Sequence, residues 1–168
     1  IYKYDDLNRF VSVSEAFGGS SLTTHFTYEP NTGRLHETTY PTGYRLRREY
    51  SPTGHLKRLT DGSGSTLWLT REKNAMGQIT KYMTGNYVGS TLKYDDDTHR
   101  LRGILTQQVA KNQNILQDMS YDYDDFGNLA ARKDNMRNLE ERFTYDNLNR
   151  LNSIRLNGVA SAMEYDAY

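Results

Sequence analysis

The chain has 168 residues, and its 21 basic and 21 acidic side chains balance to a formal net charge of zero. A nucleic-acid partner or an anionic membrane surface usually requires a basic excess, so the sequence predicts neither. The chain contains no cysteine, which excludes disulfides, a thiol nucleophile and a thiolate zinc site.

The apolar content is low, because hydrophobic residues make up only 36% of the chain. Tyrosine is abundant, with 14 copies, whereas disordered segments are usually poor in aromatic residues. No apolar run approaches the roughly 18 residues of a membrane span, and there is no signal-peptide pattern. We therefore expect an ordered chain without a membrane span, held together by something other than an ordinary aliphatic core.

A short motif recurs along the whole chain. Its pattern is Tyr-Asp-x-x-Gly/Asn-Arg/Asn/His-Leu/Phe, and a degenerate copy without the tyrosine begins at Lys73. Successive copies start 20 to 29 residues apart, about 23 on average. The other copies begin, in chain order, at Tyr4, Tyr28, Tyr50, Tyr94, Tyr123, Tyr145 and Tyr165.

Each copy of the motif predicts a turn between two β-strands. Aspartate or serine after the tyrosine can accept backbone N–H bonds, and the later glycine or asparagine tolerates a positive φ. The glycines at that left-handed position are Gly33, Gly54, Gly77 and Gly127. The tyrosine then ends the incoming strand, and the leucine opens the outgoing one.

A second, more variable turn is expected between successive copies. The candidates are residues 16–21, 41–43, 61–65, 84–90, 110–114, 134–138 and 157–158. Each unit of about 23 residues would then hold two strands of about five to seven residues, which is a β-hairpin. A helix is poorly supported, since the longest candidate (residues 135–142) is short and lies where a hairpin turn is expected.

Some strands alternate between an apolar and a charged face, as in the segment 43–50. Others carry polar residues on both faces, as in 101–108, which favours a continuous ribbon over a closely packed sandwich. Tyrosine suits such a ribbon, because its ring can stack on the next repeat while its hydroxyl stays hydrogen-bonded. The predicted fold class is therefore all-β, a curved antiparallel β-ribbon of tandem hairpins.

The motifs resemble the YD-repeat, or Rhs-repeat, family over essentially the whole chain. The strongest matches are YDYDDFGNL at residues 121–129, FTYDNLNRL at 143–151 and NAMGQI at 74–79. The family includes bacterial Rhs polymorphic toxins, the shell components of Tc toxin complexes, wall-associated proteins and teneurins. The resemblance implies a ribbon that spirals into a hollow shell, which in the bacterial toxins encloses a C-terminal toxin.

The chain departs from a complete bacterial Rhs protein. It lacks the Pro-rich, self-cleaving core segment that typically ends such a shell, and it lacks a toxin domain and an N-terminal delivery domain. We therefore interpret residues 1–168 as a single array of about seven hairpin units, truncated at both ends. Its two open sheet edges would favour self-association, which sedimentation at high concentration would detect.

The sequence predicts neither a metal site nor a cofactor. The four histidines, His25, His36, His55 and His99, have no metal-ligand spacing. Residues 122–127 resemble the start of a calcium loop, but Phe126 and Lys133 occupy two of its ligand positions. Catalytic motifs are also absent, so the chain is predicted not to be an enzyme.

Two further clusters have competing explanations. Trp68, Tyr82 and Tyr87 could form a platform on which a sugar ring stacks, although stacking between repeats is the preferred explanation. The basic side chains around Arg47 are expected to pair across strands with Glu37 and Glu49.

The resemblance implies a structural segment of a large secreted or cell-surface bacterial protein, which forms the wall of a β-shell around a C-terminal toxin. The expected partners are the adjacent repeats and that toxin cargo. The alternative is an adhesion module that binds glycans or a cell-surface protein.

Overall fold

The computed structural model describes the backbone of residues 1–109 and 114–162, and the side chains of these ranges up to residue 159. The described residues form strands and turns and no helix, so none of them forms a helix that could cross a membrane. The expected all-β fold of tandem antiparallel hairpins is confirmed. Tyr165, and four residues of the turn expected at 110–114, lie outside the described residues.

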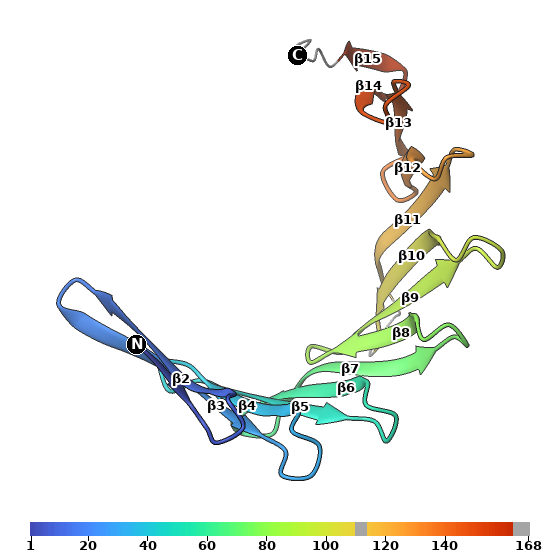
Figure 1. Ribbon diagram of the computed structural model, residues 1–168. Helices are drawn as coiled ribbons and strands as arrows, with labels where there is room; N and C mark the ends of the chain where they lie inside the picture. The colour runs from blue at the N-terminus through green and yellow to red at the C-terminus, as the bar shows by residue number, and fades with distance from the viewer. Residues whose placement is uncertain (110–113, 163–168) are drawn as a thin grey trace. The chain divides into compact units, whose positions relative to one another are not determined.

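The strands range from three to nine residues in length. In chain order they are β1 (Tyr2–Tyr4), β2 (Phe10–Phe17), β3 (Ser20–Tyr28), β4 (Leu35–Thr39), β5 (Arg45–Tyr50), β6 (Leu56–Asp61), β7 (Thr66–Lys73), β8 (Ile79–Thr84), β9 (Val88–Tyr94), β10 (Leu101–Gln108), β11 (Ile115–Tyr123), β12 (Leu129–Asp134), β13 (Leu139–Tyr145), β14 (Leu151–Leu156) and β15 (Val159–Ala162) (Figure 1).

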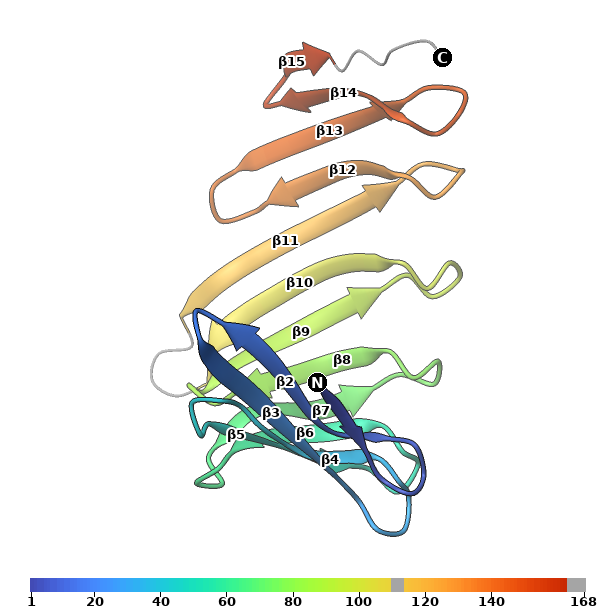
Figure 2. The ribbon, with the colours of Figure 1, turned by 60° about the vertical axis from the view of Figure 1, so that its left-hand side comes forward.

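Each strand is hydrogen-bonded to the strands that precede and follow it in the chain. The contacts divide the chain into two compact units, which we consider separately. The N-terminal unit contains residues 1–70 and 83–86, and the C-terminal unit contains residues 71–82 and the chain from residue 87 onward. In the C-terminal unit, the β9–β10, β11–β12 and β13–β14 turns lie along one edge (Figure 2).

We call the turn made by each copy of the motif a repeat turn. In the β11–β12 repeat turn, the Gly127 N–H donates to the Asp124 carbonyl at 3.0 Å, and the Asp124 N–H donates to the Asn128 carbonyl at 3.0 Å. The Asp124 carboxylate closes the turn by accepting the N–H groups of Phe126 and Asn128. The aspartate therefore takes the place of a backbone partner, as in an Asx turn.

The fifth residue of a seven-residue repeat turn, or the sixth of an eight-residue one, has a positive φ. Glycine occupies this position at Gly127 (φ 91°). Asparagine replaces it at Asn149 (φ 57°) and histidine at His99 (φ 57°). These residues bear the left-handed strain that glycine avoids.

A β-bulge follows six of the repeat turns. Tyr123 pairs with Leu129 and Asp122 with Ala131, so Ala130 has no partner in the ladder. The same shift occurs where β1, β3, β5, β9 and β13 pair with their following strands. The extra residue is always the second of the outgoing strand, so each bulge bends that strand beside its turn.

Each unit is a single layer of sheet, and the described residues include no buried apolar side chain. The buried side chains among them are polar: Ser12, Thr38, Thr60 and Ser90. Stability must therefore come from the hydrogen-bond ladder and from partly buried contacts between neighbouring hairpins, as in other repeat proteins.

Replacing Gly127 with valine should destabilise the chain by about 1 kcal/mol or more, because a β-branched residue is strained at positive φ. A Cβ atom at Gly127 would also collide with the Arg100 guanidinium. Thermal unfolding would measure the loss.

Gly64→Val is a matched control, since Gly64 has the same φ of 91° but open space around the added Cβ. We expect the Gly127 variant to be the less stable of the two. An unchanged melting temperature for Gly127→Val would contradict the turn geometry.

Candidate functional site: the contacts between successive repeat turns

The repeat tyrosines each occupy the last position of an incoming strand. Tyr4, Tyr28, Tyr50, Tyr94, Tyr123 and Tyr145 end β1, β3, β5, β9, β11 and β13, respectively. The four repeat glycines lie in the turns that follow, with φ angles of 69° at Gly33, 87° at Gly54, 80° at Gly77 and 91° at Gly127. The structure thus places these sequence-predicted residues at recurring positions along the repeat-turn edge of each unit.

Five of these tyrosines link one repeat to the one before it. The Tyr145 hydroxyl donates to the Leu129 carbonyl at 2.9 Å. The last residue pair between β12 and β13 on this side is Ala131–Arg142. Leu129 lies two residues beyond that pair, so its carbonyl accepts a hydrogen bond from the Tyr145 hydroxyl where the pairing of the two strands has ended. The equivalent bonds run from Tyr28 to Phe10 (2.7 Å), Tyr50 to Leu35 (2.8 Å), Tyr94 to Ile79 (3.2 Å) and Tyr123 to Leu101 (3.0 Å).

The degenerate copy replaces this link with a shorter side chain. Lys73 stands where the tyrosine would be. The carbonyl of Leu56, which opens β6, instead accepts the Thr70 hydroxyl at 3.1 Å. The strand-opening carbonyl therefore keeps a side-chain donor even where the motif loses its tyrosine.

The residue after the left-handed position makes a second link, now toward the following repeat. The Arg9 guanidinium pairs with Asp5 of its own turn at 2.6 Å. It also lies 4.3 Å from the Tyr28 ring centroid and donates to the Gly33 carbonyl at 3.5 Å. A cation over an aromatic ring contributes about 0.5–1 kcal/mol at an exposed site.

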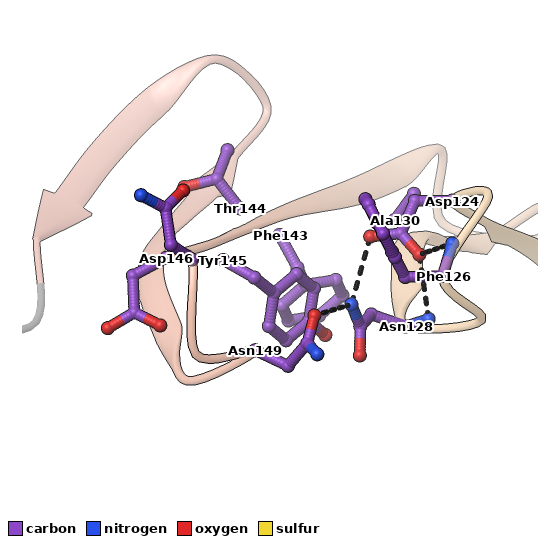
Figure 3. Close-up of a pocket in the computed structure, with 10 residues that line it drawn as sticks. Asp124, Phe126, Asn128, Ala130, Phe143, Thr144, Tyr145, Asp146 and Asn149 are labelled. Carbon is purple, nitrogen blue, oxygen red and sulfur yellow. Dashed lines mark hydrogen bonds between the residues drawn. The ribbon is translucent and has the colours of Figure 1, made fainter.

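Two repeats carry an amide at this position instead of arginine. The Gln78 Nε2 group donates to the His99 carbonyl at 2.8 Å, and the Asn128 Nδ2 group donates to Asn149 Oδ1 at 3.1 Å. Figure 3 shows Asn128 and Asn149 facing each other beside the aromatic side chains of β13. The amides keep the hydrogen bond to the next turn but bring no charge.

Hydrogen bonds within the repeat turns lower the pKa of their aspartates. At Asp5 the hydrogen bond from the Arg9 side chain lowers the pKa most. At Asp95 and Asp146 the largest lowering of the pKa comes from a hydrogen bond with a backbone N–H group. At Asp124, burial opposes the ionised form, but hydrogen bonds from Asn128 and the turn backbone outweigh it, so its pKa is also lowered.

The other side-chain clusters singled out in the sequence are the metal-ligating residues, the basic cluster around Arg47 and the aromatic residues around Trp68. No group of three or more metal-ligating side chains occurs within the described residues. The expected cross-strand pairs are confirmed, with Arg47–Glu37 at 2.6 Å and Arg58–Glu49 at 3.3 Å. Trp68 belongs to the N-terminal unit, whereas Tyr82 and the exposed Tyr87 belong to the C-terminal unit, so the proposed sugar platform stays a prediction.

Sequence reasoning missed the bulges, the stacked arginines and the tyrosine-to-carbonyl bonds. A signal for the arginines was present, because Arg9, Arg34 and Arg100 share one motif position. Their partners lie in the next repeat, about 20 residues further along the chain, so the motif alone did not reveal the contact.

Lowering the pH should destabilise the chain through the turn aspartates. Their folded-state pKa values lie below the roughly 3.9 of an unfolded aspartate, so their contribution is present above about pH 4 and is lost as the pH falls through the folded pKa. Thermal unfolding at pH 7 and pH 3 would measure this loss. In Asp146→Asn, which retains the acceptor oxygen without the titrating group, the drop should be smaller; an equal drop in both proteins would contradict this account.

Replacing Tyr123 with phenylalanine should cost about 0.5–1.5 kcal/mol, because the ring stays while the hydrogen bond to the Leu101 carbonyl is lost. Tyr44→Phe is the control, since the Tyr44 side chain is 46% exposed. Chemical denaturation of both variants would compare them. Equal stabilities would show that the hydroxyl link contributes nothing.

Comparison with known proteins agrees with this repeat architecture. The chain resembles a crystal structure of TcdB2-TccC3-Cdc42, with 29% identity and a TM-score of 0.69 over 80% of this chain and 7% of that chain. A crystal structure of TcdB2-TccC3 without its hypervariable C-terminal region has the same fold, with 24% identity and a TM-score of 0.75 over 90% of this chain and 9% of that one. The chain thus spans less than a tenth of the length of either.

The curated proteins include no match to the chain. The model of the teneurin YD-shell family matches residues 1–168, that is, the entire sequence. The resemblance seen in the repeated motif is thereby confirmed, and the chain belongs to the teneurin YD-shell family.

Proposed function

We propose that the chain is one segment of the wall of a β-shell, which encloses a toxin polypeptide that follows it in the parent protein. The observation that carries this proposal is the single-layer sheet without a buried apolar side chain in the described residues. Such a sheet separates two sides and is stabilised mainly by its neighbours in sequence. A shell wall requires both properties: it must separate an inside from an outside, and it must be stable through contacts between successive repeats.

The wall can grow without a core because every repeat brings its own connections. A hairpin adds backbone hydrogen bonds, a tyrosine hydroxyl bonded to the preceding repeat and, at some positions, an arginine stacked on the next tyrosine. We propose that residues 1–168 are one continuous array of this kind. Its partners would be further repeats at the two edges, formed by β1 and β15, where a second copy of the chain could also pair.

The proposal also covers the location of the parent protein and the contribution of this segment to it. The parent would be a secreted or cell-surface bacterial protein, and this segment would enclose its cargo without performing catalysis. The likeness to the TcdB2-TccC3 crystal structures supports this assignment.

The experiment is a protease-protection assay on the intact parent protein. The polypeptide that follows the repeats should resist a soluble protease while the parent is folded, and it should be cleaved rapidly when expressed alone. Equal cleavage rates in the two settings would show that the repeats enclose nothing.

The same preparation tests the adhesion alternative. Binding on a glycan array that is lost in Trp68→Ala would favour a recognition module. The shell proposal instead expects no Trp68-dependent glycan binding.

A further inference from the structure

Exposed apolar side chains of the C-terminal unit gather at its turns. Within the described residues of this unit, every large apolar side chain that is exposed lies in a turn or within two residues of a strand end. Apolar residues in the middle of strands are half-buried instead, as are Leu92, Ile104 and Met119, which lie side by side in register. The exposed apolar surface therefore belongs to the two turn edges of the unit.

One edge holds the β12–β13 and β14–β15 turns and the ends of β10 and β11 that lie on the same side; we call it the linker-turn edge (Figure 2). Each of its three successive hairpins presents two exposed apolar side chains. They are Val109 and Ile115, Met136 and Leu139, and Leu156 and Val159. An exposed apolar row of this kind is typical of an interaction surface.

The opposite edge carries the repeat turns, and two successive turns present an apolar side chain at the fourth position of the motif. Phe126 is 83% exposed and Leu148 is 72% exposed. Both residues close their turns through the backbone, because their N–H groups donate to the turn aspartates Asp124 and Asp146. Turn closure therefore does not require these two side chains, which are available for contact with a partner.

The repeat-turn edge is acidic at its tips. Asp96, Asp97 and Asp125 are exposed there, and no ion pair engages them within the described residues. Arg100 and Arg150 of the same turns are already engaged, by an aromatic ring and by a carboxylate, respectively. The charge that this edge offers to a partner is therefore negative.

The linker-turn edge is basic by comparison. Arg155 is exposed, and no ion pair engages it in the part of the chain that the structure describes. Arg137 pairs with Asp134 at 2.9 Å, but its side chain is 76% exposed and that of Asp134 only 17%, so the guanidinium is the outer group. The two apolar edges thus carry charges of opposite sign, and such complementarity favours their association.

Both rows have the period of the ribbon itself. Successive turns on one edge are separated by two strands, which is roughly 10 Å at about 4.8 Å per strand. A partner can match several of these turns at once only if it has the same repeat. A second copy of this chain has that repeat, and it also supplies the edge of opposite charge.

We propose that the linker-turn edge of one copy docks against the repeat-turn edge of a second copy. The apolar side chains of the β12–β13 and β14–β15 turns pack around Phe126 and Leu148 of the second copy, while Arg137 and Arg155 face its acidic tips. This contact joins turns, so it is separate from backbone pairing at the open strands β1 and β15. It also does not depend on what the wall encloses.

Contact between unlike edges determines how the assembly grows. Two linker-turn edges would oppose their arginines, and two repeat-turn edges would oppose their aspartates, so pairing of like edges is disfavoured. Pairing of unlike edges leaves one free edge of each kind on the dimer, to which further copies can add. We therefore expect association that increases with concentration and continues beyond a dimer.

Sedimentation velocity of the full chain over a range of concentrations tests the proposal. Phe126→Asp and Met136→Asp each place a charge in one of the two rows, and each should weaken self-association at least about tenfold. Both positions are exposed, so the melting temperature should stay near that of the unmodified chain. Tyr2→Pro is the control, because it disrupts backbone pairing at the open β1 edge, and it should change the association less than about twofold.

Cysteine cross-linking identifies which edges meet, since the chain has no cysteine of its own. The Phe126→Cys and Met136→Cys proteins are mixed and oxidised, and the disulfide-linked products are mapped by mass spectrometry. Because a disulfide requires the two Cβ atoms to approach within roughly 4 Å, the mixed dimer should exceed either homodimer severalfold. Val159→Cys in place of Met136→Cys covers a shift of the contact by one hairpin.

The proposal is overturned if the chain stays monomeric over this range, or if the folded Phe126→Asp protein associates like the unmodified chain. Predominance of the Met136→Cys homodimer would also overturn it, in favour of contact between like edges. Loss of association in Tyr2→Pro would assign the association to backbone pairing at the open strand edge instead.

Discussion

The rest of the structure depends on how each repeat satisfies the carbonyl that opens its outgoing strand. The β-bulge beside the turn shifts the register, and the Leu129 carbonyl then lies beyond the end of the β12–β13 ladder. The Tyr145 hydroxyl supplies the donor from the next repeat. Since the described residues bury no apolar side chain, such polar links take the place that core packing has in a globular domain.

This constraint explains why tyrosine serves better than phenylalanine at the motif position. Its ring covers part of the neighbouring turn, and its hydroxyl reaches a backbone acceptor that the ladder leaves free. Thr70 performs the second task alone where Lys73 replaces the tyrosine. The hydrogen bond is therefore retained even at the position where the ring is lost.

The turn aspartates and the stacked arginines belong to the same system. Asp5 closes its own turn and also holds Arg9, whose guanidinium then lies over Tyr28 of the next repeat. Where asparagine or glutamine replaces the arginine, the turn still closes, and the amide donates a hydrogen bond to the next turn instead. The left-handed residue of that next turn is then Asn149 or His99 instead of glycine, so the two motif positions change together without disturbing the sheet.

The sequence by itself determined the period, the all-β class and the position of the turns. Tyrosine, aspartate and glycine act there through local backbone geometry, which the order of residues specifies. The tertiary structure decided the bulges at residues such as Ala130, the hydroxyl-to-carbonyl bonds and the stacking of arginines on the tyrosines of the next repeat. These features depend on the register between strands of different repeats and on side-chain reach across about 20 residues of chain, so a single motif does not encode them.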